Sequence, residues 1–256
     1  MSATNVSEFA SIVASVGTVS SQLMNLSALP SIIEIHRAKS TLLYPAFPFV
    51  IAIAAAFVGL AYALLSKQYV VLISVFCSAT INSSFLLVHL YYSQKRSAIV
   101  RSLLLLLLAD AIALGLGPAI GCIGATGDHC LQFSLTWIGV VCTIVYCVVY
   151  CGQLSTFREV IRTKNSGSIS APLTAGTLFC VAIWTWYSVL VMDLYYLTSS
   201  VVGDISALIQ VVLLFSYPSI RTTEPTDHEI ENFIPLNVFK HPLRGEIVGV
   251  KSGSTS

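Results

Sequence analysis

The sequence predicts an all-α membrane protein in which seven transmembrane helices form two parallel three-helix bundles joined by a linker helix, a 3+1+3 arrangement. Of its 256 residues, 55% are hydrophobic and only 10% are charged, whereas soluble proteins carry about 25% charged residues. The chain also contains seven long apolar stretches, and its two halves repeat one pattern. A net charge of +1 excludes a nucleic-acid partner, which would require a clustered basic face.

Each apolar stretch is long enough to cross a membrane, because about 20 apolar residues span the hydrocarbon core. The predicted spans are Phe9–Ile33, Tyr44–Leu65, Tyr69–Tyr92, Ser102–Ala125, Leu131–Leu154, Ala171–Val191 and Leu194–Pro218. No basic residue precedes the first stretch, so we expect it to stay in the membrane rather than act as a cleaved signal peptide. The lipid bilayer is therefore the first predicted partner.

The basic residues predict the orientation of these helices. The loops after spans 1, 3 and 5, together with the C-terminal tail, hold twelve of the 13 lysines and arginines. The other side of the membrane would hold only Lys67. The positive-inside rule therefore predicts an outer N terminus and a cytoplasmic C terminus.

The first and last thirds of the chain behave as two copies of one unit. Lys39 and Lys164, Pro48 and Pro172, and Tyr62 and Tyr187 lie 125, 124 and 125 residues apart. We therefore divide the chain into a first repeat at 1–92, a linker helix at 93–130, a second repeat at 131–218 and a flexible cytoplasmic tail at 219–256. Parallel repeats with a substrate site near the membrane midplane are a transporter architecture.

Residues 10–218 resemble the SWEET family of sugar transporters, within the wider PQ-loop superfamily. The similar stretches are Trp184-Thr185-Trp186-Tyr187 with Asp193, Gly203 and Gln210 (family pattern W-x-x-Y…D…N-x-x-G…Q), Lys39-Ser40-Thr41 with Pro48-Phe49 (K-S-T…P-[YF]), and Thr80-Ile81-Asn82 with Tyr92 (T-I-N…Y). The chain departs from the family at Ser200, where the family has asparagine, and at Gly59, which matches Trp184 of the second repeat. It also has Gly152-Gln153 where the family has a hinge proline.

The resemblance implies a bidirectional, facilitative uniporter that moves a glucose-like or sucrose-like sugar down its gradient by alternating access. It implies no enzyme activity, no cofactor, residence in the plasma membrane or an endomembrane, and a homo-oligomer. The alternative is a proton-coupled PQ-loop transporter of an amino acid or other small solute, with Asp204 as the proton carrier. A seven-helix receptor would explain the number of helices but not the repeat.

The predicted substrate site lies between the two bundles and consists of Asn82, Gly59, Trp184, Ser200 and Asp204. An amide at the depth of Asn82 needs partners because lipid offers none, so it binds either sugar or a neighbouring helix. Trp184 lies too deep in its span for an interfacial belt, and an indole packs well on a sugar ring. Asp204 is a neutral sugar ligand, a proton carrier or a structural acid, and we favour the first.

The resemblance further implies an extracellular gate formed by Tyr62, Tyr187 and Asp193, and hinges at Pro30, Pro48 and Pro172. Without the resemblance, the gate residues would indicate an aromatic belt with a solvated aspartate. No metal site is expected, because Cys147 and Cys151 have no further ligands nearby. Cys122 and Cys130 flank the outer end of span 4, and the sequence leaves open whether they pair.

Overall fold

The computed structural model describes residues 3–41, 46–123, 127–151, 154–166 and 171–217. The chain divides into two units, Met1–Ser219 and Ile220–Ser256. The predicted tail at 219–256 lies outside the described residues, and everything below concerns the first unit.

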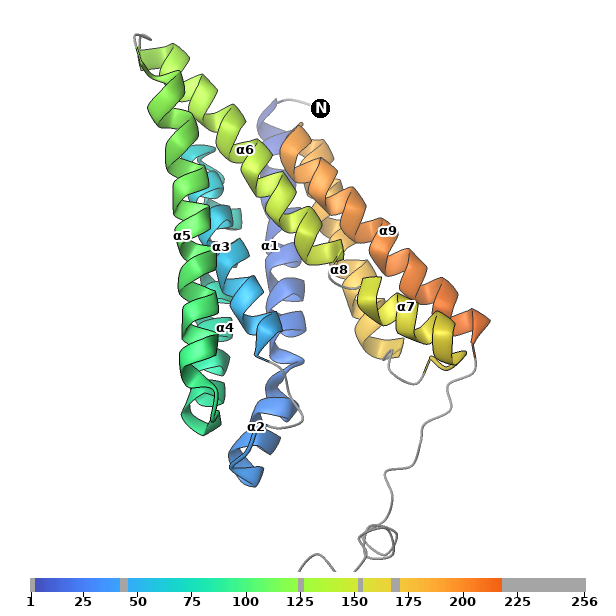
Figure 1. Ribbon diagram of the computed structural model, residues 1–256. Helices are drawn as coiled ribbons and strands as arrows, with labels where there is room; N and C mark the ends of the chain where they lie inside the picture. Colours follow the sequence, from blue (N-terminus) through green and yellow to red (C-terminus); the bar gives the residue numbers. More distant parts are fainter. Residues whose placement is uncertain (1–2, 42–45, 124–126, 152–153, 167–170, 218–256) are drawn as a thin grey trace, which may run out of the picture. The chain divides into compact units, whose positions relative to one another are not determined.

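Within the described ranges the regular structure consists of nine helices (Figure 1). They are α1 (Ala3–Leu26), α2 (Leu29–Ala38), α3 (Phe47–Leu65), α4 (Tyr69–Tyr92), α5 (Arg96–Gly121), α6 (Gly127–Cys151), α7 (Leu154–Thr163), α8 (Ala171–Leu190) and α9 (Leu194–Ser216). Seven segments are long and apolar enough to cross a membrane, which confirms the predicted number. The linker helix α5 begins at Arg96 rather than at the predicted Ser102, because hydropathy marks only the hydrocarbon core and the helix continues beyond it.

The first span of each repeat is interrupted near its end. Helix α1 ends at Leu26 and α2 begins at Leu29 after a turn; α6 ends at Cys151 and α7 begins at Leu154. Both pairs of boundaries lie 125 residues apart, so the two repeats are broken at equivalent positions. The Gly152-Gln153 pair lies outside the described residues.

The three predicted hinge prolines all lie in the first turn of a helix. Pro30 lies in the first turn of α2, directly after the break in the first span. Pro48 and Pro172 are likewise the second residues of α3 and α8. The first backbone N–H groups of a helix have no partner within the helix, so proline is well tolerated there. A role of these prolines as hinges stays a prediction.

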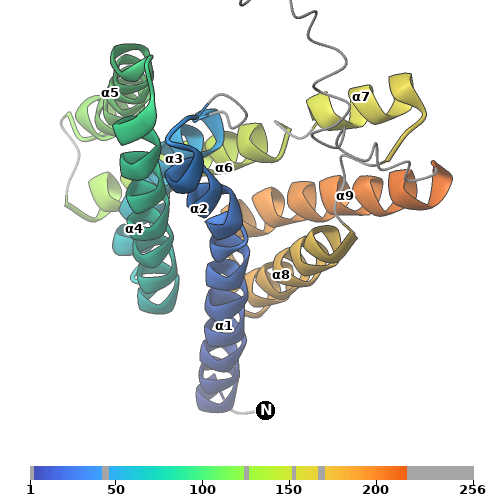
Figure 2. The same cartoon turned by 90° about the horizontal axis from the view of Figure 1, so that it is seen from below.

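The packing of the helices follows the repeat. In each bundle the third span is central: α4 packs against α1, α2 and α3, and α9 packs against α6, α7 and α8. The bundles meet where α1 packs against α8 and α3 packs against α6, and α5 packs against α3 and α6 (Figures 1 and 2). At both contacts the first helix of one repeat meets the second helix of the other. This confirms the 3+1+3 fold with parallel repeats.

The backbone repeats the same pattern in detail. Among the described non-glycine residues, positive φ angles occur at Lys39 (53°), Lys67 (57°), Lys164 (56°) and Met192 (54°). Such angles are uncommon outside glycine. Lys39 pairs with Lys164 and Lys67 with Met192, again 125 residues apart, so the chain turns in the same way in both repeats.

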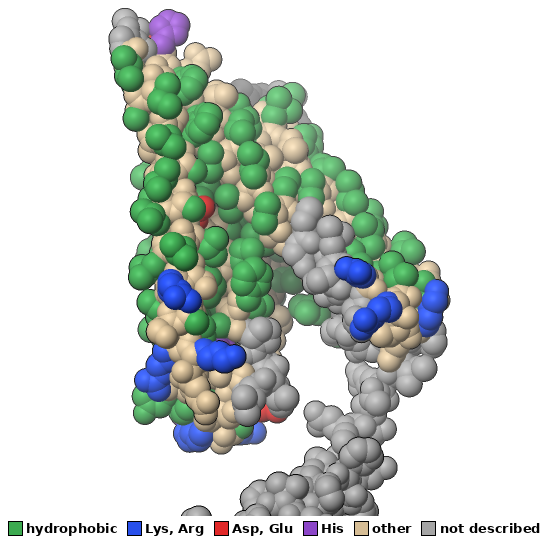
Figure 3. Space-filling model, viewed as in Figure 1, with side chains coloured by type: hydrophobic (Ala, Val, Ile, Leu, Met, Phe, Trp, Pro, Cys, Tyr) green, Lys and Arg blue, Asp and Glu red, His purple; other side chains and the backbone are tan. Residues whose placement is uncertain are grey.

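The two ends of the helices differ in charge. Figure 3 shows lysine and arginine side chains gathered at one end, with hydrophobic side chains covering the helices between the ends. These cations belong to the ends of α2 and α7 and the start of α5, and we call this the basic end. The N terminus and the α3–α4 and α8–α9 turns lie at the opposite end. There a disulfide joins Cys122 to Cys130, with the Cα atoms 4.7 Å apart.

Candidate functional site

Four side chains tie the two repeats together at the opposite end, and we call them the closing cluster: Tyr62, Gln68, Tyr187 and Asp193. The Tyr62 hydroxyl donates to Asp193 Oδ2 at 2.7 Å, and Gln68 Nε2 donates to the same oxygen at 2.7 Å. The Tyr187 hydroxyl donates to Gln68 Oε1 at 3.4 Å. Tyr62 and Tyr187 are only 5% and 6% exposed, so the cluster is a buried contact and not a solvated belt.

The closing cluster is internally symmetric. Tyr62 and Tyr187 lie 125 residues apart, as do Gln68 and Asp193. Gln68 precedes α4 and Asp193 precedes α9, each as the N-cap residue. Each tyrosine therefore donates a hydrogen bond to the residue that begins the central helix of the other repeat. The sequence prediction missed Gln68, although the offset from Asp193 could have found it.

Trp184 lies beneath this cluster, between α8 and α1. Its indole N–H donates to Ser21 Oγ at 2.9 Å, and its ring makes edge contacts with Tyr187 and Tyr196, both at 5.7 Å between centroids. An added Cβ on Gly17 would lie 3.1 Å from the indole, so the bare backbone of α1 lets the ring approach. Trp184 is 8% exposed, which argues against an interfacial anchor.

The equivalent contact, between α3 and α6, has the large and the small residue on the opposite helices. Gly59 is the position that matches Trp184, and Tyr146 of α6 is the position that matches Ser21. An ideal Cβ on Gly59 would lie 2.6 Å from the Tyr146 hydroxyl. The aromatic ring thus comes from α8 at one contact and from α6 at the other. Gly59 was predicted as a site residue, whereas Tyr146 was missed.

We expect Gly59→Ala to lower sugar exchange, because its methyl group would displace the Tyr146 hydroxyl. Overpacking of this kind costs about 1–3 kcal/mol. The Gly59→Ala/Tyr146→Phe double variant removes the hydroxyl oxygen that would clash with the new methyl group. We expect it to recover most of the lost thermal stability. Melting temperature and sugar exchange of the two variants and Tyr146→Phe alone form the measurement. No recovery in the double variant would show that the loss has another cause.

A polar cluster joins α1 to α4 deeper in the membrane. Asn82 Nδ2 donates to Asn25 Oδ1 at 3.1 Å and to the Ser78 carbonyl at 2.9 Å. Asn25 Nδ2 in turn donates to Ser78 Oγ at 2.9 Å, and Gln22 Nε2 donates to the Ser74 carbonyl at 3.1 Å. Asn82 therefore bonds a neighbouring helix, and a role in sugar binding stays a prediction. The sequence prediction missed Gln22 and Asn25.

The second repeat replaces this polar contact with an aromatic one. Tyr150 matches Asn25, and Gly203 matches Ser78, both at the offset of 125. An ideal Cβ on Gly203 would lie 2.9 Å from the Tyr150 ring. Ser200 lies on α9 one turn before Gly203 and is 4% exposed. The two repeats therefore place side chains at equivalent backbone positions of the candidate site. The first repeat supplies amides there, and the second supplies a tyrosine.

Asp204 directly follows Gly203 on α9. Its carboxylate accepts a hydrogen bond from the Thr185 hydroxyl of α8, and the side chain is half-buried. This contact joins two helices of the same repeat. It is the kind of contact expected if Asp204 is a structural acid. No group of three or more histidine, cysteine, aspartate or glutamate side chains that could hold a metal ion occurs in the described part of the chain.

Comparison with known proteins agrees with this geometry. A family model described as "Sugar efflux transporter for intercellular exchange" matches the chain twice, at residues 11–97 and 136–222. The chain belongs to this family. Its two matches begin 125 residues apart, the same offset that relates the helix breaks and the closing cluster. Membership of the sugar efflux family makes the chain a membrane transporter rather than an enzyme and confirms the resemblance predicted from its motifs.

Known members of the sugar efflux family align over most of the chain. The bidirectional sugar transporter NEC1 of Petunia hybrida is 27% identical over 78% of this chain and 74% of its own length. The bidirectional sugar transporter SWEET9 of Arabidopsis thaliana is 24% identical over 91% of this chain and 89% of its own. The structure of a eukaryotic SWEET transporter at 3.7 Å resolution has a TM-score of 0.68 and 20% identity, covering 80% of this chain and 95% of the other. That likeness supports the fold.

Proposed function

We propose that the chain is a uniporter that carries a mono- or disaccharide down its gradient by alternating access between the two repeats. The closing cluster carries this proposal. It joins the repeats at the opposite end, through hydrogen bonds contributed by both. In Figure 3 a gap separates the two halves at the basic end. Closure at one end and separation at the other are expected of a transporter open to one side of the membrane.

The proposed sugar site lies between the closing cluster and the gap. Trp184 supplies a flat ring, and Asn25 and Asn82 supply amide groups that both donate and accept hydrogen bonds. Tyr146 and Tyr150 contribute aromatic rings with hydroxyl groups, which approach Gly59 and Gly203. An aromatic face with convergent donors and acceptors suits a sugar ring, whose faces are apolar and whose edge is hydroxylated. We keep Ser200 and Gly59 as lining positions.

We propose that the basic end faces the cytoplasm and that the N terminus is outside, because basic loops stay on the cytoplasmic side. We further propose the plasma membrane as the site of action, because the matching family model describes intercellular exchange, and a homo-oligomer as the assembled form. The repeat boundaries at 1–92, 93–130 and 131–218 are part of the same proposal; α4 ends at Tyr92, whereas α6 already begins at Gly127.

Uptake and efflux of radiolabelled glucose and sucrose, in cells that lack their own sugar transporters, test the proposed function. We expect flux in both directions that follows the sugar gradient and changes little with an imposed proton gradient. Net uptake against the sugar gradient when the outside is acidified would contradict uniport and favour the proton-coupled alternative.

Asp204 separates these two mechanisms. Because its carboxylate already bonds Thr185, we expect Asp204→Asn to keep exchange within about twofold of wild type, a change below 0.5 kcal/mol. Thr185→Val is the matched variant, since it removes the same contact from the other side. Loss of net uptake with intact exchange in Asp204→Asn would assign proton coupling to this residue instead.

A further inference from the structure

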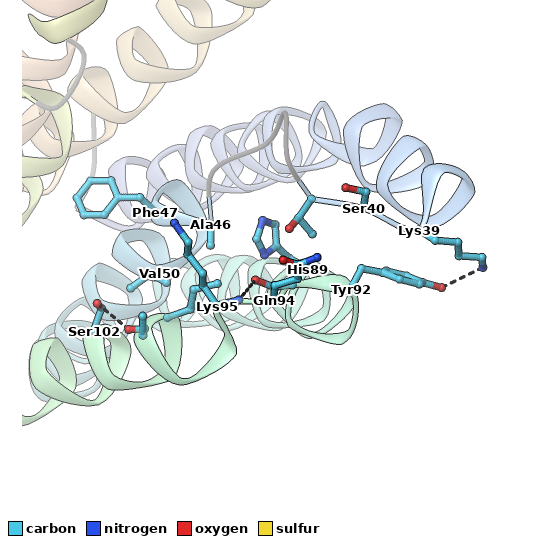
Figure 4. Close-up of a pocket in the computed structure, with 14 residues that line it drawn as sticks. Lys39, Ser40, Ala46, Phe47, Val50, His89, Tyr92, Gln94, Lys95 and Ser102 are labelled. Atoms are coloured by element: carbon cyan, nitrogen blue, oxygen red, sulfur yellow. Dashed lines mark hydrogen bonds between the residues drawn. The ribbon is translucent and has the colours of Figure 1, made fainter. Parts of the chain in front are cut away.

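The first repeat holds an open cavity at the basic end that the transport proposal does not use. It has a volume of about 630 Å³ and lies among the end of α2, the start of α3, the end of α4 and the start of α5 (Figure 4). Its polar lining includes Lys39, Ser40, His89, Ser93 and Lys95. None of the 14 side chains that line it is acidic. A cavity with two ammonium groups and no carboxylate is complementary to an anion.

Lys39 and Lys95 are held at the edges of the cavity by their surroundings. Lys39 Nζ donates to the Tyr92 hydroxyl at 3.2 Å and lies 5.1 Å above that ring, while the same hydroxyl bonds His36 Nδ1 at 2.8 Å. Lys95 is the N-cap residue of α5, and Figure 4 shows its side chain extending toward Phe47 at the start of α3. His89 is 3% exposed and projects into the same space.

The second repeat has the equivalent framework without these groups. Lys164 lies 5.1 Å above the ring of Tyr217, at positions that match Lys39 and Tyr92. Leu214, however, matches His89, and in the sequence Ile220 matches Lys95. The lysine over a tyrosine ring therefore occurs in both repeats, whereas His89 and Lys95 have aliphatic counterparts at the matching sequence positions of the second repeat. A fold requirement would have appeared in both.

We propose that this cavity binds a phosphate monoester carried on a hydroxylated ring. Lys95 would contact the phosphate as a point charge, assisted by the N-terminal end of α5 with its partial positive charge. Lys39 lies at the opposite edge of the cavity, on Tyr92 (Figure 4), and would add its positive charge at longer range. The hydroxyls of Ser40, Thr41 and Ser93 and the imidazole of His89 are suited to ring hydroxyls. The volume falls within the range of about 300–1,000 Å³ typical of small-molecule sites and leaves room for a ring beside the phosphate.

Two sources could present this chemistry at the basic end. One is the headgroup of a phosphorylated inositol lipid, since basic cavities among transmembrane helices bind such headgroups on the cytoplasmic side. The other is a soluble sugar phosphate. Both assignments rest on the proposed function in one respect, the cytoplasmic orientation of the basic end.

Binding to the full-length protein in phosphatidylcholine nanodiscs tests the proposal. The probes are radiolabelled glucose 6-phosphate and a fluorescent short-chain phosphatidylinositol 4-phosphate. We expect at least one probe to bind, with an affinity at least about tenfold lower in Lys39→Gln/Lys95→Gln, a loss of roughly 1.4 kcal/mol. Lys164→Gln, the equivalent change in the second repeat, should stay within about twofold of wild type. Lys95→Gln alone leaves the Lys39–Tyr92 contact in place and should weaken binding by at least about threefold.

The binding results either assign a ligand to this cavity or overturn the proposal. Lysine-dependent binding of the lipid probe assigns the site to the membrane, and lysine-dependent binding of the sugar phosphate assigns it to a soluble ligand. Absence of binding by both probes, or an equal loss in Lys164→Gln, overturns the proposal. Glucose exchange in proteoliposomes of the same protein reports on transport separately. Exchange without probe binding would refute this site only, and probe binding without exchange would refute only the transport proposal.

Discussion

We expect Trp184→Ala to lose sugar exchange by more than about tenfold while surface expression stays near normal. The change removes an indole that contacts Tyr187 and Tyr196 and donates to Ser21. Each aromatic contact contributes about 0.5–1.5 kcal/mol beyond its buried area, and a sugar ring would lose the surface on which we expect it to pack. Equilibrium exchange of radiolabelled glucose, normalised to surface protein, is the measurement.

Trp186 provides the matched control. It lies on the same helix two residues later but is 54% exposed, and its ring meets that of Phe9 edge-on at 5.7 Å between centroids. We expect Trp186→Ala to exchange sugar within about twofold of wild type. If both alanine variants behave alike, Trp184 contributes packing rather than a substrate surface.

The second large effect is expected at Asp193, whose carboxylate accepts hydrogen bonds from Tyr62, Gln68 and the backbone of Tyr196. Asparagine is as good an N-cap as aspartate, so Asp193→Asn preserves the start of α9. Its one remaining side-chain oxygen cannot serve all three donors, and its amide hydrogens would face two of them. We expect exchange to fall more than about tenfold with little change in melting temperature.

Two further variants isolate the cause. Asp128→Asn removes an exposed carboxylate at the same end of the molecule, in the first turn of α6, and should leave exchange unchanged. Asp193→Ala removes both the cap and the closing contacts, so it should lower the melting temperature as well, by an amount matching a cap loss of about 1 kcal/mol. Wild-type exchange in Asp193→Asn would show that the closing cluster does not control access.

The hydrogen-bond partners of the site were the least predictable feature. Gln68, Tyr146 and Asn25 lie in no recognisable motif, and each acquires its place through a residue from another helix. Tyr146 fills the space above Gly59 of α3, and Gln68 bonds Asp193 from the other repeat. The distance between such partners along the chain hides them from any local pattern. The repeat offset alone could have indicated Gln68, because it equals the spacing of the two tyrosines.

The sequence by itself determined the seven spans, the parallel repeats, the linker helix and the family. These depend on the length of apolar stretches and on motif spacing, which are properties of the chain before it folds. Only the tertiary structure decided that Pro48 and Pro172 begin helices, that Asp204 bonds Thr185, and that Asn82 bonds Asn25. Those outcomes depend on where a helix begins and how it is rotated against its neighbour. Hydropathy leaves both undefined, since lipid accepts any apolar face and packing alone selects which one turns inward.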